Sequence, residues 1–244
     1  MYKSLTAFSL FLISSALPAA EQTGALWSYS GQTAPIHWSS LDPHYGSCAG
    51  QNQSPINIER GVDAKLAPLK FNYRTQAKQI KVNELTLQVD FNSGASVVID
   101  GQPFELKQFH IHTPSENWLH GKQYPLELHL VHANAQGELA VVALLYKQGQ
   151  ENKALNTVLR HMPKSENAVQ LNRKINAAEI LPKRLAYYRF NGSLTTPPCT
   201  EGVRWIVLKE IQTVSAQQLH AFEQQLEHPN NRPVQPQNAR LVLE

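Results

Sequence analysis

Three histidines carry the strongest chemical signal in this 244-residue sequence: His110 and His112 in KQFHIHTPSE, and His129 in PLELHLVHA. Residues two apart on a β-strand point to the same face, so His110 and His112 can aim both imidazoles into one cavity. Three imidazoles on rigid strands suit a tetrahedral Zn²⁺ ion that keeps its fourth position open for water. Such a site is catalytic, because a structural zinc site is closed by a fourth protein ligand.

Two neighbouring polar side chains strengthen the metal interpretation. Gln108 shares the strand face of His110 and His112, and its amide oxygen can accept a hydrogen bond from a ligand imidazole. Glu127 stands two residues before His129 and can orient that ring in the same way. The alternative is that the H-x-H pair consists of ordinary strand histidines without a metal, or is half of an unrelated site.

A second informative segment is FNGSLTTPPCTEGVRWIVLKE, in which Pro197 and Pro198 predict a stiff loop before an apolar strand. Thr195 and Thr196 place two hydroxyls on this loop. A threonine hydroxyl beside a metal-bound hydroxide can accept its proton in a hydrogen bond and so aim the oxygen lone pair at a substrate. Glu116 is a candidate acceptor for the threonine's own proton. On its own, the TTPP segment favours an ordinary turn.

The elements that must hold these residues are mainly β-strands. Short runs rich in valine, isoleucine, leucine and aromatic residues alternate with polar residues and end at glycine, proline or asparagine. Residues 92–94 and 135–137 have the composition of hairpin turns. Helices that alternate with the strands are missing, which argues against a doubly wound parallel sheet. We therefore predict a mainly β (α+β) single domain on a large, mostly antiparallel central β-sheet with short surface helices.

Two surface helices are predicted. Ser215 followed by Gln218 fits a capping box that opens the segment AQQLHAFEQQL. Residues 152–161 begin a second segment whose apolar residues share one helical face, namely Leu155, Val158, Leu159 and Met162.

The first 20 residues, MYKSLTAFSLFLISSALPAA, have the pattern of a secretory signal peptide. Lys3 supplies the positive charge, and the apolar stretch from Leu5 to Leu17 is too short to span a bilayer. The small residues Ala19 and Ala20 place cleavage near residue 21. A buried N-terminal helix is the alternative interpretation.

Composition limits the partners and the compartment. The formal net charge is +3, and lysine and arginine are scattered, which disfavours nucleic-acid binding. No other stretch is apolar enough to cross a membrane, so we expect no membrane association after signal cleavage. The chain has two cysteines, Cys48 and Cys199, and an exported protein is expected to pair them in a disulfide. Two free buried thiols are the alternative.

Together these residues resemble the α-class carbonic anhydrases. The matching segments run in order along nearly all of the chain after residue 20: WSYSG (27–31), QNQSPINI (51–58), QFHIH, SEN, ELHLVH, SLTTPP and WIVLKE. The cysteine pair, just before QNQSPINI and just after TTPP, is similar to that of the bacterial exported branch. The resemblance implies one catalytic domain over residues 21–244 and a sheet of about ten strands, a size within the usual range.

The resemblance also assigns roles to single residues. His110, His112 and His129 match the zinc ligands. Thr195 matches the threonine that orients the zinc-bound hydroxide, and Glu116 matches the carboxylate that accepts the threonine's proton. The implied reaction is the zinc-dependent, reversible hydration of carbon dioxide to bicarbonate and a proton, by attack of that hydroxide.

Further positions complete the implied site. Gln108 and Glu127 match the partners that hold the first and third ligands, and Thr196 matches a threonine that contacts bicarbonate and inhibitors. Tyr29 and Asn83 match polar residues that hold ordered waters. The apolar wall where carbon dioxide docks is matched by Val131, Val141, Leu194, Val203 and Trp205.

The resemblance implies Zn²⁺ as the cofactor, carbon dioxide or bicarbonate as the substrate, and sulfonamides and anions as inhibitors. The protein is then expected in the periplasm or secreted, as a monomer or homodimer. One departure stands out. The family's proton-shuttling histidine is replaced by Leu85 in the run Val82-Asn83-Glu84-Leu85, and leucine cannot carry a proton. Glu84 is nearby, but its ordinary pKa of about 4.3 matches the task poorly.

Two other interpretations fit parts of the same pattern. A cupin-like metal oxygenase would use the H-x-H pair with Glu116 as a fourth ligand and a redox-active iron or manganese. Against it, the glycines that flank the cupin motif are absent, and residue 104 is Phe104. A non-enzymatic zinc-binding or interaction module on the same scaffold would typically have lost a ligand histidine, whereas all three remain here, as does Thr195.

Overall fold

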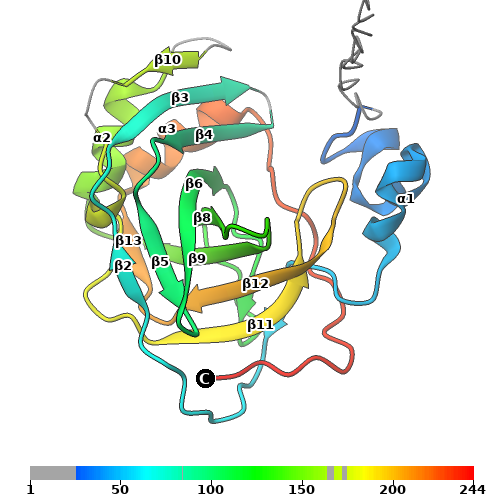
Figure 1. The fold of residues 1–244 in the computed structure, drawn as a ribbon. Coiled ribbons are helices and arrows are strands. Elements are labelled where there is room, and N and C mark those ends of the chain that lie inside the picture. Colours follow the sequence, from blue (N-terminus) through cyan, green and yellow to red (C-terminus); the bar gives the residue numbers. More distant parts are fainter. Residues whose placement is uncertain (1–25, 84, 164–167, 172–174) are drawn as a thin grey trace, which may run out of the picture.

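A central sheet of eleven strands dominates the computed structural model, which describes residues 26–244 except 84, 164–167 and 172–174 (Figure 1). The strands are β2 (Lys70–Asn72), β3 (Ala77–Asn83), β4 (Thr86–Phe91), β5 (Ser96–Ile99), β6 (Gln102–His112), β8 (Leu126–Ala133), β9 (Leu139–Gln148), β10 (Ala168–Gln170), β11 (Tyr187–Ser193), β12 (Glu201–Leu208) and β13 (Gln212–Val214). A separate parallel pair joins β1 (Asn57–Ile58) to β7 (Trp118–Leu119).

The strand order β10-β3-β4-β6-β8-β9-β12-β11 is antiparallel except where β12 meets β9. Strand β13 also pairs with β9 in parallel, β5 pairs with β6, and β2 pairs with β5. The predicted large, mostly antiparallel sheet is therefore confirmed.

The predicted turns have different outcomes. Residues 135–137 join β8 to β9, which pair as an antiparallel hairpin, as predicted. Residues 92–94 form a turn but not a hairpin turn, so that prediction was wrong. Strands β4 and β5 do not pair with each other across it. Each pairs with a different half of the long strand β6, residues 108–111 and 102–105 respectively.

Both predicted helices form. Helix α3 (Ala216–Leu226) opens with the complete capping box between Ser215 and Gln218. Helix α2 (Lys153–His161) is capped by the Asn152 side chain, which accepts a hydrogen bond from the backbone N–H of Leu155 at 3.1 Å. The other helical elements are α1 (Trp38–Leu41) and the short 3₁₀ turns Gly31–Thr33, Pro35–His37, Pro43–Ala49 and Ala177–Glu179.

One face of the sheet is buried in the main hydrophobic core, and the opposite face carries the histidines. On β6, Phe109 and Ile111 are fully buried in a core that includes Leu155 of α2 and Phe222 of α3. Burial of this apolar face is the main stabilising term for such a sheet. Because side chains alternate along a strand, the residues that follow each of them, His110 and His112, face the other way.

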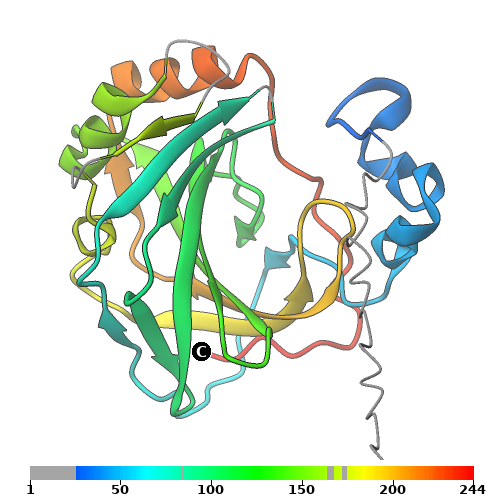
Figure 2. The same cartoon turned by 45° about the horizontal axis from the view of Figure 1, so that its top comes forward.

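The N-terminal segment forms a small core of its own around Trp38, Tyr45 and the two cysteines. Figures 1 and 2 show this segment on the side of the molecule away from α2 and α3. The predicted disulfide between Cys48 and Cys199 is present and closes a sequence separation of 151 residues. In the chain-entropy treatment, a loop of this length is worth about 5 kcal/mol at most.

No helix in the described part of the chain is long and apolar enough to cross a membrane. The predicted signal peptide, residues 1–20, lies outside the described residues.

Candidate metal centre and active site

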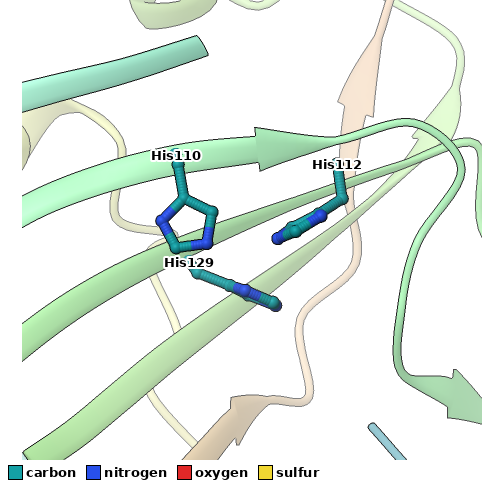
Figure 3. Close-up of side chains that lie close together, drawn as sticks. All are labelled: His110, His112 and His129. Atoms are coloured by element: carbon teal, nitrogen blue, oxygen red, sulfur yellow. The ribbon is translucent and has the colours of Figure 1, made fainter. Parts of the chain in front are cut away.

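The register of β6 and β8 brings the three histidines together. His110 pairs directly with His129 across the two strands, and His112 follows two residues later on the same face. Figure 3 shows the three rings converging on one point. One nitrogen of each ring lies within 4.8 Å of the others, and the ring centroids are 4.6–5.2 Å apart.

Each imidazole is held through its other nitrogen. Gln108 Oε1 accepts a hydrogen bond from His110 Nδ1 at 2.9 Å, and Glu127 Oε1 accepts one from His129 Nε2 at 2.9 Å. These are the two partners that the sequence suggested. Such bonds fix the tautomer of a ring and leave the lone pair of the opposite nitrogen free.

The holder of the second histidine was not found from the sequence. His112 Nδ1 donates to the backbone carbonyl of Asn230 at 2.7 Å. The Asn230 side chain is fixed in turn, because it accepts from Thr113 N at 2.9 Å and donates to the carbonyls of Ile111 and Leu85 at 2.9 and 3.2 Å. No sequence signal connects residues 118 positions apart through a main-chain oxygen.

The electrostatics keep all three rings neutral. Burial lowers the pKa of His110 and of His129 well below the usual range, and repulsion from neighbouring rings adds to it. Burial also lowers the pKa of His112, although the Asn230 carbonyl and the nearby Glu127 carboxyl oppose this. Neutral imidazole is the form that binds a metal ion.

Glu127 is the most heavily bonded carboxyl in this region. Besides His129, it accepts from the backbone N–H groups of Glu116 and Asn117, both at 2.7 Å, and from the Asn117 side chain at 2.7 Å. Burial raises the pKa of Glu127 to about 7, and the bonds from Asn117 oppose the rise. These bonds fix the loop 113–117 against β8.

Glu116 lies beside the nitrogens through which the three histidines face one another. Its Oε1 accepts from the backbone N–H of Arg232 at 2.8 Å, and its Oε2 lies 3.5 Å from His112 Nε2. Burial raises the pKa of Glu116 to about 8, while the Arg232 N–H and the Thr195 hydroxyl lower it. A cation bound by the imidazoles would favour the ionised carboxylate. The structure thus brings Thr195 and Glu116 together, as the sequence suggested.

The five apolar residues of the expected wall gather in one cluster on the histidine side of the sheet. Trp205 packs edge-on against His129, with ring centroids 4.9 Å apart, and its indole N–H donates to the Ser193 carbonyl at 2.9 Å. The cluster contains all five: Val131, Val141, Leu194, Val203 and Trp205.

A cavity of about 220 Å³ opens onto His110 and His112. Thr196, Tyr29 and Asn83 line it, so these three predicted residues are brought to the same space. Leu85 lines it as well, while Glu84 lies outside the described residues. Gln108, which the sequence also indicated, lines the cavity too, whereas Trp27, Thr86 and Gln88 are lining residues that the sequence did not indicate.

Comparison with known proteins decides the family. A profile described as "Eukaryotic-type carbonic anhydrase" matches residues 33–244. The chain belongs to the α-carbonic anhydrase family. This membership, together with relatives that are named carbonic anhydrases, shows an enzyme of this class.

The chain is similar to bacterial carbonic anhydrases over most of its length. The carbonic anhydrase of Pectobacterium atrosepticum is 42% identical over 239 residues, which are 97% of this chain and 98% of that protein. Among solved structures, the Photobacterium profundum α-carbonic anhydrase is 48% identical, with a TM-score of 0.85, 90% of this chain covered and 100% of that one. The Thermovibrio ammonificans enzyme in complex with sulfanilamide is 46% identical, with a TM-score of 0.88 and coverage of 91% and 100%.

Membership of the α-carbonic anhydrase family replaces the cupin-like interpretation. Glu116 is close to the histidines, as that interpretation required: its Oε2 lies 3.5 Å from His112 Nε2, while its Oε1 accepts from the Arg232 backbone N–H. The spacing of H-x-H and Glu116 is shared by both families. The match to the family over residues 33–244 therefore decides between the two interpretations, and the spacing does not.

Proposed function

We propose that this α-carbonic anhydrase uses Zn²⁺ to hydrate carbon dioxide reversibly to bicarbonate and a proton. The observation that carries the proposal is the cluster of His110, His112 and His129. Their rings converge, and the outer nitrogen of each is held by a separate acceptor. Family membership supports the carbon dioxide chemistry.

The three histidines fit zinc on chemical grounds. His112 Nε2 is buried without a hydrogen-bond partner, which is costly unless another group occupies the space it faces. Three neutral imidazole nitrogens are the donor set of catalytic zinc sites that keep one position for solvent. In carbonic anhydrases generally, zinc lowers the pKa of its coordinated water to about 7, so that hydroxide is available at neutral pH.

Thr195 and Glu116 would orient the attacking oxygen. A hydroxyl has one proton to donate, and the Glu116 carboxylate would accept it. The Thr195 oxygen is then left as an acceptor for the proton of the attacking group. This hydrogen bond holds the proton away from the substrate and directs a lone pair towards it. Correct orientation of reacting atoms supplies a large share of enzymatic rate enhancement.

The apolar wall would receive the substrate. Carbon dioxide has no net dipole, so it gains little from polar groups and is favoured against aliphatic side chains that exclude water. Val141, Val203 and Trp205 are almost completely buried, whereas Val131 and Leu194 are partly exposed on the same cluster. The partly exposed pair would form the surface that the gas contacts.

The polar side of the cavity would handle product and proton. Thr196 would contact bicarbonate, and Tyr29 and Asn83 would order water in the cavity that all three residues line. Burial raises the pKa of Tyr29, so its phenol stays protonated and a hydrogen-bond donor at neutral pH. Leu85 offers no proton acceptor at the position where the family has its shuttle. The proton would therefore leave to a buffer base from solution.

The remaining expectations belong to the same proposal. Residues 1–20 would direct export to the periplasm or the medium, where the disulfide forms. Sulfonamides and small anions would inhibit, since a homologue of 46% identity is known with sulfanilamide bound. The protein would act as a monomer or homodimer.

A stopped-flow assay of carbon dioxide hydration tests the proposal directly. The mature protein is assayed as isolated, after chelation, after reloading with Zn²⁺, and with a sulfonamide. We expect activity that is lost on chelation, restored by zinc and abolished by the sulfonamide. Full activity in the metal-free protein, or none after zinc loading, would refute it.

A further inference from the structure

Arg232 is a buried cation that the proposed reaction does not use. Only 2% of it is exposed. Its Nη1 donates to Gln53 Oε1 at 2.8 Å and to the Ser54 carbonyl at 2.9 Å, and its Nη2 donates to the Cys48 carbonyl at 2.9 Å. The guanidinium also lies 5.5 Å from the Trp38 ring. The side chain is therefore anchored in the N-terminal segment and the disulfide.

The main chain of the same residue holds Glu116. The Arg232 backbone N–H donates a hydrogen bond to Glu116 Oε1 at 2.8 Å. A shift of the Arg232 backbone would therefore move this carboxylate. The side-chain bonds determine where that backbone lies.

The anchor of Arg232 also holds the loop that carries Thr195. Gln53 accepts from Arg232 and donates through Nε2 to the Cys199 carbonyl at 3.2 Å. The next residue, Ser54, donates its backbone N–H to Ser193 Oγ at 2.9 Å. Residues 53 and 54 thus contact the loop on both sides of Thr195. The bonds among residues 53, 54 and 232 therefore hold both the Thr195 loop and the Glu116 carboxylate in position.

We propose that Arg232 is a positioning residue that sets the placement of Glu116 relative to Thr195. The inference rests on the proposed carbon dioxide hydration. It assigns Arg232 no contact with substrate or metal. Its effect on the rate passes through the geometry of the Glu116 carboxylate.

Packing alone does not explain an arginine here. No carboxylate lies within salt-bridge distance of the guanidinium among the described residues, and its Nε has no hydrogen-bond partner. Burial lowers the pKa of Arg232 to about 10, so the group remains charged at neutral pH. A buried charge is costly, and an apolar side chain of similar volume is often no less stabilising. What an apolar side chain lacks is the planar fork that binds three oxygens at once.

Arg232→Lys keeps the positive charge and removes the planar guanidinium that donates to three oxygens. We expect kcat/KM for hydration to fall about 10- to 100-fold, as small displacements of catalytic groups cause. Zinc content should stay at one ion per chain, because none of the three histidines contacts this side chain. The matched control is Arg240→Lys. Arg240 also donates to three backbone carbonyls, those of Gln237, Asn191 and Pro236, but it lies at the outer surface, and kcat/KM should not change.

A double-mutant cycle with Glu116→Gln separates positioning from general support of the fold. If Arg232 acts through Glu116, Arg232→Lys has little further effect on kcat/KM once Glu116 is glutamine. An equal loss in both backgrounds would overturn the inference, as would wild-type kcat/KM in Arg232→Lys. If that variant yields no folded protein, Gln53→Ala removes one of the three acceptors and is tested in the same cycle.

The wild-type protein in the same assay keeps the two proposals distinguishable. If the wild type is active but Arg232→Lys lowers kcat/KM equally with Glu116 and with Gln at position 116, only the positioning role is refuted. An inactive zinc-loaded wild type refutes the proposed function, and the inference falls with it. Rates are compared per folded molecule, with the folded fraction measured by circular dichroism at each condition.

Discussion

The candidate site has two sides that are built in different ways. The metal side consists of His110, His112 and His129 on the paired strands β6 and β8. The orienting side consists of Thr195 and Glu116, which lie on loops outside the strands. On the metal side, two of the three ring-holding contacts span two residues of sequence. On the orienting side, the contact that holds the Glu116 carboxylate and the two that hold the threonine loop to residues 53 and 54 span 116 to 146 residues.

The two sides therefore differ in how much of the fold must form before their side chains are correctly placed. Strand pleat and register place the metal-side rings on one face, and only His112 is held from outside the two strands, by the Asn230 carbonyl. The orienting side needs the C-terminal segment, the N-terminal segment and the disulfide to be in place together. We therefore expect mutations on the two sides to have separable effects, on zinc binding and on turnover respectively.

The largest effect is expected on the metal side, from His129→Ala. Removing one of three imidazoles leaves too few ligands for a stable zinc site. Zinc should be lost on dialysis, and hydration should fall to the uncatalysed background, as measured by elemental analysis and stopped flow. The control is His220→Ala on the exposed surface of α3, which should keep both. Substantial catalysis by a zinc-free His129→Ala protein would contradict the metal side as described.

The next effect is expected on the orienting side, from Thr195→Ala. The zinc ligands are unchanged, so zinc content should be normal. Without the hydroxyl that aims the attacking oxygen, kcat/KM should fall about 100-fold, the usual cost of losing such an orienting group. Thr200→Ala, an exposed threonine in the same loop, is the control. A loss of zinc in Thr195→Ala would show that the two sides are not separable.

The metal side was largely predictable because its signals are local. Side-chain parity placed His110 and His112 together and added Gln108. The same parity joined Glu127 to His129. The cross-strand pairing of His110 with His129 was not predictable from parity, since it depends on which strands become neighbours. It follows from the β6–β8 register, which the structure shows.

The orienting side was predictable only by resemblance. Thr195 and Glu116 carry no spacing relation to each other, and a TTPP loop alone is an ordinary turn. Asn230 and Arg232 were missed entirely because they act through a main-chain carbonyl and a main-chain N–H, which any residue possesses. The wrong turn at residues 92–94 has a similar origin. The composition of a turn does not reveal that both flanking strands pair with a third.

A smaller effect within the metal side is expected from the residues that hold the rings. Glu127→Gln replaces the carboxylate that accepts from His129 and from the 116–117 backbone. Zinc affinity should fall about 10- to 100-fold, the usual range for such partners. Gln108→Ala should cost less, because one neutral acceptor is lost. Competition with a chelator measures both, and Gln136→Ala in the exposed 135–137 turn is the control. Unchanged zinc affinity in Glu127→Gln would argue that the ring is held by packing alone.

The smallest effect is expected at Leu85, which lines the cavity between the two sides without taking part in either. Among the described residues that line this cavity, the titratable side chains are Tyr29, His110 and His112, and burial raises the pKa of that tyrosine. Proton release should therefore limit turnover in dilute buffer, and concentrated imidazole should raise kcat severalfold while leaving kcat/KM unchanged. Leu85→His supplies an imidazole with an ordinary pKa of about 6.5, so it should raise kcat in dilute buffer and reduce the response to added imidazole. Leu85→Ala, which opens the same space without a base, is the control. A wild-type kcat that is indifferent to buffer concentration would mean that a group outside this lining carries the proton, and Leu85→His would then change nothing.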